Sequence, residues 1–124
     1  MHIACENSRL PIVHLLLSNH CNVNAQNKLK ETPLHVAARV GNVKIVEMLL
    51  DYHINSRFFK NVKSFGNEIN LNIQDSDGMT PLMRAFQREP NQDGSTEIIK
   101  LLVSNDCDVN QVDNLGNTAL FYAL

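Results

Sequence analysis

Cysteine and histidine are the residues of this chain best suited to metal binding or nucleophilic catalysis, and it has three Cys and five His. Structural zinc sites use such residues at short, fixed spacings. Cys5, His14, His20 and Cys21 are the right ligand types, but their spacing matches no zinc pattern. No Cys and His are spaced in a way that indicates a catalytic pair, in which the His would activate the thiol. We therefore expect no metal site and no catalytic residue, and we expect the cysteines to be small buried hydrophobic residues. A reactive thiol is the alternative.

The acidic run Asp75–Gly78 is faintly similar to part of a calcium-binding loop. Such a loop needs an oxygen ligand at its first position and a carboxylate at its twelfth. This chain has Ile73 and Arg84 at those two positions, so calcium binding is not expected. The five glycines are scattered, and no glycine-rich phosphate loop is present. The sequence predicts no cofactor.

The overall composition is that of an ordinary folded domain. The 124 residues are 44% hydrophobic and 19% charged, which is too apolar for intrinsic disorder. A net charge of −2 gives no field that would attract nucleic acid. No apolar run approaches the ~18 residues of a membrane span, so membrane insertion is not expected. The odd number of cysteines and the absence of a signal peptide favour an intracellular location, cytoplasmic or nuclear.

An internal repeat sets the positions of all these residues. Thr32–His35 recurs as Thr80–Met83 and again as Thr118–Phe121, at steps of 48 and 38 residues. The apolar triplet Leu15–Leu17 recurs 33 residues later as Met48–Leu50. The underlying period is therefore 33 residues, with about 15 residues inserted in one unit and about five in the next.

Each unit is predicted to be a turn followed by two short helices. Thr32 is a good N-cap, and Pro33 suits the first helical position because its missing N–H is not needed there. Gly41 then ends the first helix, and the apolar residues of Val43–Leu50 form one broad face of a second. A helix pair of this size cannot bury its apolar face alone, so the units must stack.

These motifs resemble the ankyrin repeat family. Thr32–Ala38, Asp77–Leu82 and Cys107–Asn110 match its signature closely. The resemblance covers nearly the whole chain apart from the two insertions. The resemblance implies an all-α solenoid of stacked helix-turn-helix units joined by β-turn or hairpin loops. It also implies that His35 and its counterpart His2 form a structural hydrogen bond from a helix start to a neighbouring turn.

The repeats have expected boundaries. The chain divides into a partial repeat at 1–25, a repeat at 26–73 with the longer insertion around 55–69, a repeat at 74–111 with the shorter insertion around 89–94, and a partial repeat at 112–124. Because both ends fall inside a repeat, we expect the chain to be part of a longer array or of a multidomain protein.

The chain departs from the family pattern where glycine is usual. His20, His53 and Asp106 follow the second helices, and Lys30 occupies a turn position where other units have Gly. If the backbone is left-handed there, each non-glycine residue costs roughly 1 kcal/mol. The first half of the array is therefore predicted to be less stable than the family average.

The function implied by the resemblance is non-catalytic binding of a protein partner through a concave groove and the turn tips. The residues at these positions are Lys28, Leu29, Glu31, Arg39, Val40, Ser76, Asp77, Met79, Gln87, Arg88, Asn114, Leu115 and Asn117. Alternatively, the chain is the recognition or targeting segment of a larger enzyme, of a channel, or of a viral or microbial effector.

Two further features concern single segments. The longer insertion carries Arg57, Phe58, Phe59 and Lys60, which we expect to pack on the array, with partner contact as the alternative and nucleic-acid binding as a weaker one. Asn110 lies in a context that resembles the asparaginyl-hydroxylation sites of ankyrin repeats.

Overall fold

The computed structural model describes residues 1–58, 68–87 and 94–123, without the side chains of residues 52–58. Seven helices and no strands are found in these ranges. They are α1 (His2–Glu6), α2 (Leu10–Ser18), α3 (Pro33–Val40), α4 (Val43–Phe58), α5 (Pro81–Phe86), α6 (Ser95–Ser104) and α7 (Ala119–Ala123). None of the helices in the described ranges combines the length and apolar character needed to cross a membrane.

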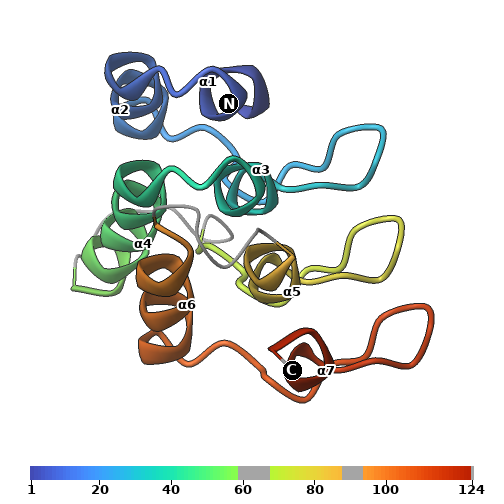
Figure 1. Cartoon of the computed structure of the whole chain (residues 1–124). Coiled ribbons are helices and arrows are strands. Elements are labelled where there is room, and N and C mark those ends of the chain that lie inside the picture. The colour runs from blue at the N-terminus through green and yellow to red at the C-terminus, as the bar shows by residue number, and fades with distance from the viewer. Residues whose placement is uncertain (59–67, 88–93, 124) are drawn as a thin grey trace.

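The helices form two layers that run the length of the array (Figure 1). Helices α1, α3, α5 and α7 contact one another in sequence in the first layer, and α2, α4 and α6 do so in the second. Three loops project from the first layer on the same side (Figure 1). We call them finger 1 (26–31), finger 2 (74–79) and finger 3 (112–117). The predicted all-helical solenoid is confirmed.

Local capping chemistry explains where the first-layer helices begin and end. The Thr32 hydroxyl accepts a hydrogen bond from the His35 backbone N–H, and Thr80 does the same for Met83. Pro33 occupies the first helical position of α3. Gly41, with a φ of 83°, ends α3 in the left-handed conformation that glycine adopts most readily. These starts and stops are as predicted.

The core lies between the two layers. Leu34 of α3 and Leu82 of α5 are almost completely buried, in the same hydrophobic cluster as second-layer residues such as Ile45, Leu49 and Ile98. Each buried leucine or isoleucine contributes about 1.5–3 kcal/mol to folding. Because every unit shares this core with its neighbours, burial depends on stacking rather than on one central cluster.

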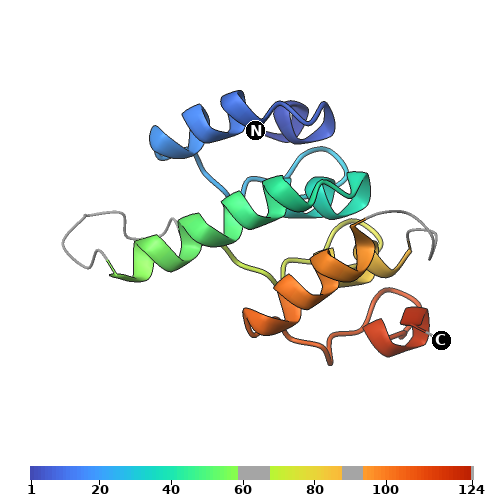
Figure 2. The same cartoon turned by 60° about the vertical axis from the view of Figure 1, so that its left-hand side comes forward.

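The left-handed positions were predicted correctly with one exception. His20, Lys30 and Asp106 have φ values of 55°, 59° and 62°. The prediction was wrong for His53, because α4 continues through this residue to Phe58. The start of the predicted longer insertion therefore lengthens a helix, and Figure 2 shows α4 extending beyond α2 and α6. The remainder of that insertion (59–67) and most of the shorter one (88–93) lie outside the described residues.

Candidate functional site

One side chain in each finger closes the loop from inside. The Asp75 Oδ1 atom accepts hydrogen bonds from the backbone N–H groups of Asp77 at 2.9 Å and Met79 at 3.1 Å. Asn27 and Asp113 make the same pair of bonds in fingers 1 and 3. Backbone bonds across the base, such as Asp75 N to Met79 O at 2.9 Å, complete each finger. The fingers are therefore ordered hairpin loops.

Successive fingers are joined by backbone hydrogen bonds. The Ser76 N–H donates to the Leu29 carbonyl at 2.9 Å, and the Asn114 N–H donates to the Asp77 carbonyl at 3.0 Å. The Asn114 amide also donates to the Ser76 carbonyl at 2.9 Å. These bonds hold the three tips in a fixed row.

A glutamine adds a side-chain bond to this row. Gln74 Nε2 donates to the Val112 carbonyl at 2.6 Å, and Gln26 occupies the equivalent position in finger 1. In fingers 1 and 2 the glutamine follows an apolar residue, whereas in finger 3 it precedes one, as Gln111-Val112. The Gln111 Oε1 atom is consequently buried and has no hydrogen-bond partner among the described residues, and half of Val112 is exposed.

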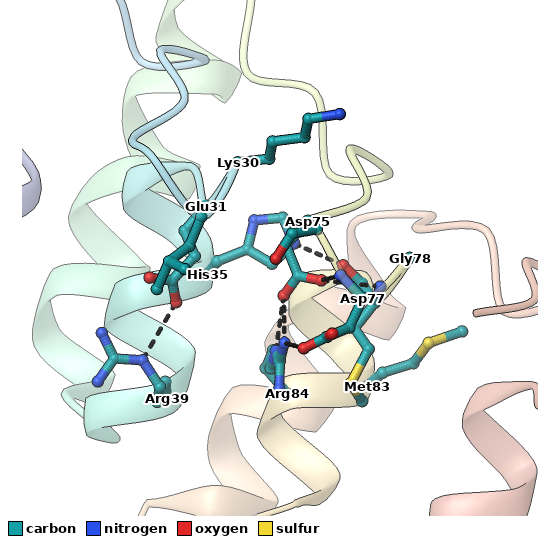
Figure 3. Close-up of polar contacts among 12 residues, drawn as sticks. Lys30, Glu31, His35, Arg39, Asp75, Asp77, Gly78, Met83 and Arg84 are labelled. Carbon is teal, nitrogen blue, oxygen red and sulfur yellow. Dashed lines mark hydrogen bonds and ion pairs between the residues drawn. The ribbon is translucent and has the colours of Figure 1, made fainter. Parts of the chain in front are cut away.

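His35 connects a helix start to the neighbouring finger, as predicted. Its Nδ1 accepts from the Thr32 backbone N–H at 3.1 Å, and its Nε2 donates to the Met79 carbonyl at 2.8 Å. Figure 3 shows the His35 ring directed from α3 toward finger 2. Burial lowers the pKa of His35, which is consistent with the neutral ring that these bonds require. His2 makes the corresponding contact with the Glu31 carbonyl at 2.7 Å.

A charged cluster lies below finger 2. Arg84 of α5 contacts Asp75 at 2.7 Å and Asp77 at 2.9 Å (Figure 3). The Asp75 side chain is fully buried, whereas that of Asp77 is 71% exposed. Desolvation opposes the charge on Arg84, but the two carboxylates raise its pKa overall. Asp113 and Tyr122, the equivalents of Asp75 and Arg84 in the last unit, are also hydrogen-bonded.

Arg39 of α3 forms a second charged cluster. Its guanidinium pairs with Glu6 of α1 at 2.7 Å and with Glu31 of finger 1 at 3.2 Å. The hydrogen bond with Glu6 is the largest of the contacts that raise the pKa of Arg39. Arg39 therefore links α1, α3 and finger 1 through ion pairs. Its side chain is also partly exposed.

The residues predicted to contact a partner fall into three groups. Glu31 and Met79 are only 5% and 3% exposed, so these two are corrected from surface to buried residues. Val40 and Asn117 are half-buried. The exposed group consists of Lys28, Leu29, Arg39, Ser76, Asp77, Gln87, Asn114 and Leu115.

Some predicted contacts cannot be placed. Arg88, Phe59 and Lys60 lie outside the described residues. Arg57 and Phe58 belong to α4, but their side chains are not described.

The sequence interpretation missed the charged clusters that position the fingers. A usable signal existed, because Asp75 and Arg84 are nine residues apart and Asp113 and Tyr122 repeat that spacing. The recurrence places both partners at equivalent positions of their units. It would have identified a contact between the finger base and the first-layer helix.

The Asn110 side chain differs from its counterparts in the earlier units. Asn24 Oδ1 accepts from the Asn70 N–H, and Asn72 Oδ1 accepts from the Asp108 N–H, each at 2.7 Å. Asn110 is exposed, and its side chain has no hydrogen-bond partner within the described ranges.

The cysteines lie in or beside the core. Cys5 and Cys107 are buried as predicted, and Cys21 is half-buried. Burial raises the pKa of the Cys5 thiol to about 11, so little of it is thiolate at neutral pH. In the ranges that the structure describes, no group of three or more His, Cys, Asp or Glu side chains could hold a metal ion.

Comparison with known proteins finds relatives over the full length of the chain. The family described as ankyrin repeats (three copies) matches residues 1–91 and again 58–124. The chain is 32% identical over 99% of its length to Palmitoyltransferase AKR1 of Lachancea kluyveri, and covers 15% of that protein. It is 36% identical over its full length to Rabankyrin-5 of Homo sapiens, covering 9%. It is 28% identical to the probable 26S proteasome regulatory subunit p28 of Saccharomyces cerevisiae, covering 46%.

The chain thus spans less than half the length of each of these three relatives. One of them is named as an enzyme and another as a proteasome subunit, so the shared feature is the repeat array rather than a single activity. Together, the stacked helix pairs, the fingers and the match along the whole sequence place this chain in the ankyrin repeat family, whose domains are non-catalytic and generally serve as protein-interaction modules.

Proposed function

We propose that this chain binds a protein partner through its finger tips and the adjoining surface of α3 and α5. The observation that carries the proposal is the contrast between a repeated backbone and unrepeated exposed side chains. Leu29, Asp77 and Leu115 occupy the same position of successive fingers, with equivalent internal bonds, yet differ in charge. Variable side chains on a constant frame are what selective recognition requires.

The exposure of the two leucines supports this surface. Leu29 is 60% exposed and Leu115 is 82% exposed, although neither contributes to the core. Large apolar side chains on a rigid loop lose little conformational entropy when a partner covers them, so their burial contributes directly to affinity. The hydrogen bonds between fingers keep both tips in their binding arrangement before a partner arrives.

The test is affinity capture of a partner, followed by calorimetry with the purified partner. The double variant Leu29→Ser with Leu115→Ser should weaken binding at least about tenfold, because each exposed leucine buried in an interface contributes on the order of 1 kcal/mol or more. Val103→Ser is the matched control, since Val103 of α6 is 49% exposed and lies in the other helix layer. Equal loss in both variants, or no loss in the double variant, would exclude the fingers as the binding surface.

A second candidate is that the chain is the recognition segment of a larger enzyme, channel or pathogen effector. The small share of its relatives' length that the chain covers supports this possibility. Sequencing of the complete transcript tests it: a catalytic, channel or effector domain in the same reading frame would establish it, and its absence would refute it.

Two smaller proposals accompany the main one. Exposure of Asn110 supports its hydroxylation, whereas its counterparts Asn24 and Asn72 bond to neighbouring units. Mass spectrometry after treatment with an asparaginyl hydroxylase should show one added oxygen at Asn110, and an unmodified Asn110 would refute the proposal. We also propose an intracellular location, cytoplasmic or nuclear, which microscopy of the tagged gene product would test.

A further inference from the structure

Finger 1 differs from the other two fingers in both charge and backbone strain. Its tip carries Lys28 and Lys30 on either side of Leu29. The equivalents of Lys30 are Gly78 and Gly116, and all three residues have a left-handed backbone, with φ values of 59°, 76° and 79°. This conformation is unfavourable for lysine and natural for glycine. Finger 1 therefore keeps a cation at a position where glycine would be more stable.

On the fingers and on α3 and α5, the two lysines are the described cations that lack an ion pair. Among the cations of the fingers and of α3 and α5, Arg39 pairs with two carboxylates and Arg84 pairs with two others. Lys28 and Lys30 form no ion pair with a described residue, and Figure 3 shows the Lys30 side chain extending away from the Arg84 cluster. Their charges are thus available to a partner.

The chemistry between the lysines indicates what kind of partner fits. Leu29 lies between the two cations and is 60% exposed, so the tip presents an aliphatic surface flanked by positive charge. A polypeptide segment in which acidic and aliphatic side chains alternate would complement both properties at once. A nucleic acid would satisfy the charges but would leave Leu29 without an apolar contact, and no described aromatic side chain lies on the fingers for a base to stack on.

We propose that finger 1 selects the partner, and that it takes an acidic segment whose aliphatic side chain packs on Leu29. This inference rests on the proposed function, because it assigns the partner's chemistry at the same surface. Strain retained at an exposed position commonly marks a functional residue. Lys30 fits that description.

The proposal is tested with a fluorescein-labelled decapeptide of alternating Glu and Leu, measured by fluorescence anisotropy at low salt. The variant Lys28→Ser with Lys30→Gly gives finger 1 the residues of finger 2 at these positions. Two exposed ion pairs correspond to a loss of affinity of about two- to fivefold each, or about tenfold together. At the same time Lys30→Gly should raise the melting temperature. Opposite changes in affinity and stability cannot arise from partial unfolding.

Matched controls separate this effect from net charge. Lys44→Ser with Lys100→Ser removes the same number of cations from α4 and α6, where each already pairs with a glutamate. It should leave peptide affinity unchanged. A decapeptide of alternating Lys and Leu should bind at least about tenfold more weakly than the acidic one. Equal losses in the two double variants, or a short oligothymidine that competes as well as the acidic peptide, would overturn the proposal.

The captured partner distinguishes this inference from the proposed function itself. If Leu115→Ser weakens partner binding while Lys28→Ser with Lys30→Gly leaves it unchanged, the fingers bind the partner but finger 1 does not select it. If neither variant alters binding, the proposed function fails as well. Loss of binding in both variants supports the two conclusions together.

Discussion

Gly78 is the position where the stacking of the fingers can be tested most directly. A Cβ atom added to Gly78 would lie 2.5 Å from Asn114 Oδ1 and 2.7 Å from Asn114 N, which are closer than any normal contact. The Gly78→Ala variant must therefore move finger 3 away from finger 2. Gly116 provides the control, because its φ of 79° is nearly the same as the 76° of Gly78 and nothing lies within 4 Å of its added Cβ.

The expected magnitudes follow from the bonds at stake. Alanine in a left-handed conformation costs about 1 kcal/mol or somewhat more at either position. At Gly78 the displacement also breaks the bonds from Asn114 to the Asp77 and Ser76 carbonyls. Each such bond contributes about 0.5–1.5 kcal/mol. Gly78→Ala should therefore lower the free energy of unfolding by about 2–4 kcal/mol, and Gly116→Ala by about 1 kcal/mol.

Urea unfolding followed by far-UV circular dichroism measures both changes. Asn114→Ala alone and the double variant Gly78→Ala with Asn114→Ala complete a double-mutant cycle, because they remove the side chain that the new methyl group meets. The reasoning would be refuted if the two glycine variants lost equal stability. That result would mean that finger 3 moves at no cost and that the hydrogen bonds between fingers do not hold the tips in place.

Three further predictions concern the same framework. Exchanging the two residues, as Gln111→Val with Val112→Gln, should raise the free energy of unfolding by about 1–3 kcal/mol. The exchange removes the buried Gln111 Oε1 atom, which has no hydrogen-bond partner among the described residues. An unchanged urea midpoint would contradict this. Burial lowers the pKa of His35 below its ordinary 6.5, so protonation of this residue favours the unfolded chain. The free energy of unfolding should therefore fall as the pH drops through 6.5. His35→Met should remove that pH dependence in urea titrations across this range. Arg39→Glu should cost about 2 kcal/mol at neutral pH by placing a third carboxylate beside Glu6 and buried Glu31; an unchanged melting temperature would contradict this.

The repeat architecture could be predicted because its determinants are local. Thr32 and Gly41 act through their own backbone neighbours, and their effect does not depend on the rest of the fold. The burial of Glu31 and Met79 could not be predicted in the same way. It arises because Arg39 and His35 reach these finger residues from α3 and bond to the Glu31 carboxylate and the Met79 carbonyl.

The course of α4 was mispredicted for a related reason. The repeat pattern places the end of the second helix near His53, but no glycine or proline stands there to stop it. The helix therefore continues to Phe58. The Arg84 cluster joins residues from a finger and a helix that meet only after the chain folds. Composition and charge patterning alone therefore do not predict it.

The internal closure of each finger has a consequence for how this array can change over generations. The second residue of the finger, Asn27 or Asp113, accepts hydrogen bonds from the backbone N–H groups, so the side chains of Leu29 and Leu115 take no part in closing the loop. Random substitutions at these two tips therefore have little effect on folding. Under the function proposed above, a lineage carrying this array can exchange one partner for another through single codon changes, while Asn27 and Asp113 preserve the loops that present the new side chains.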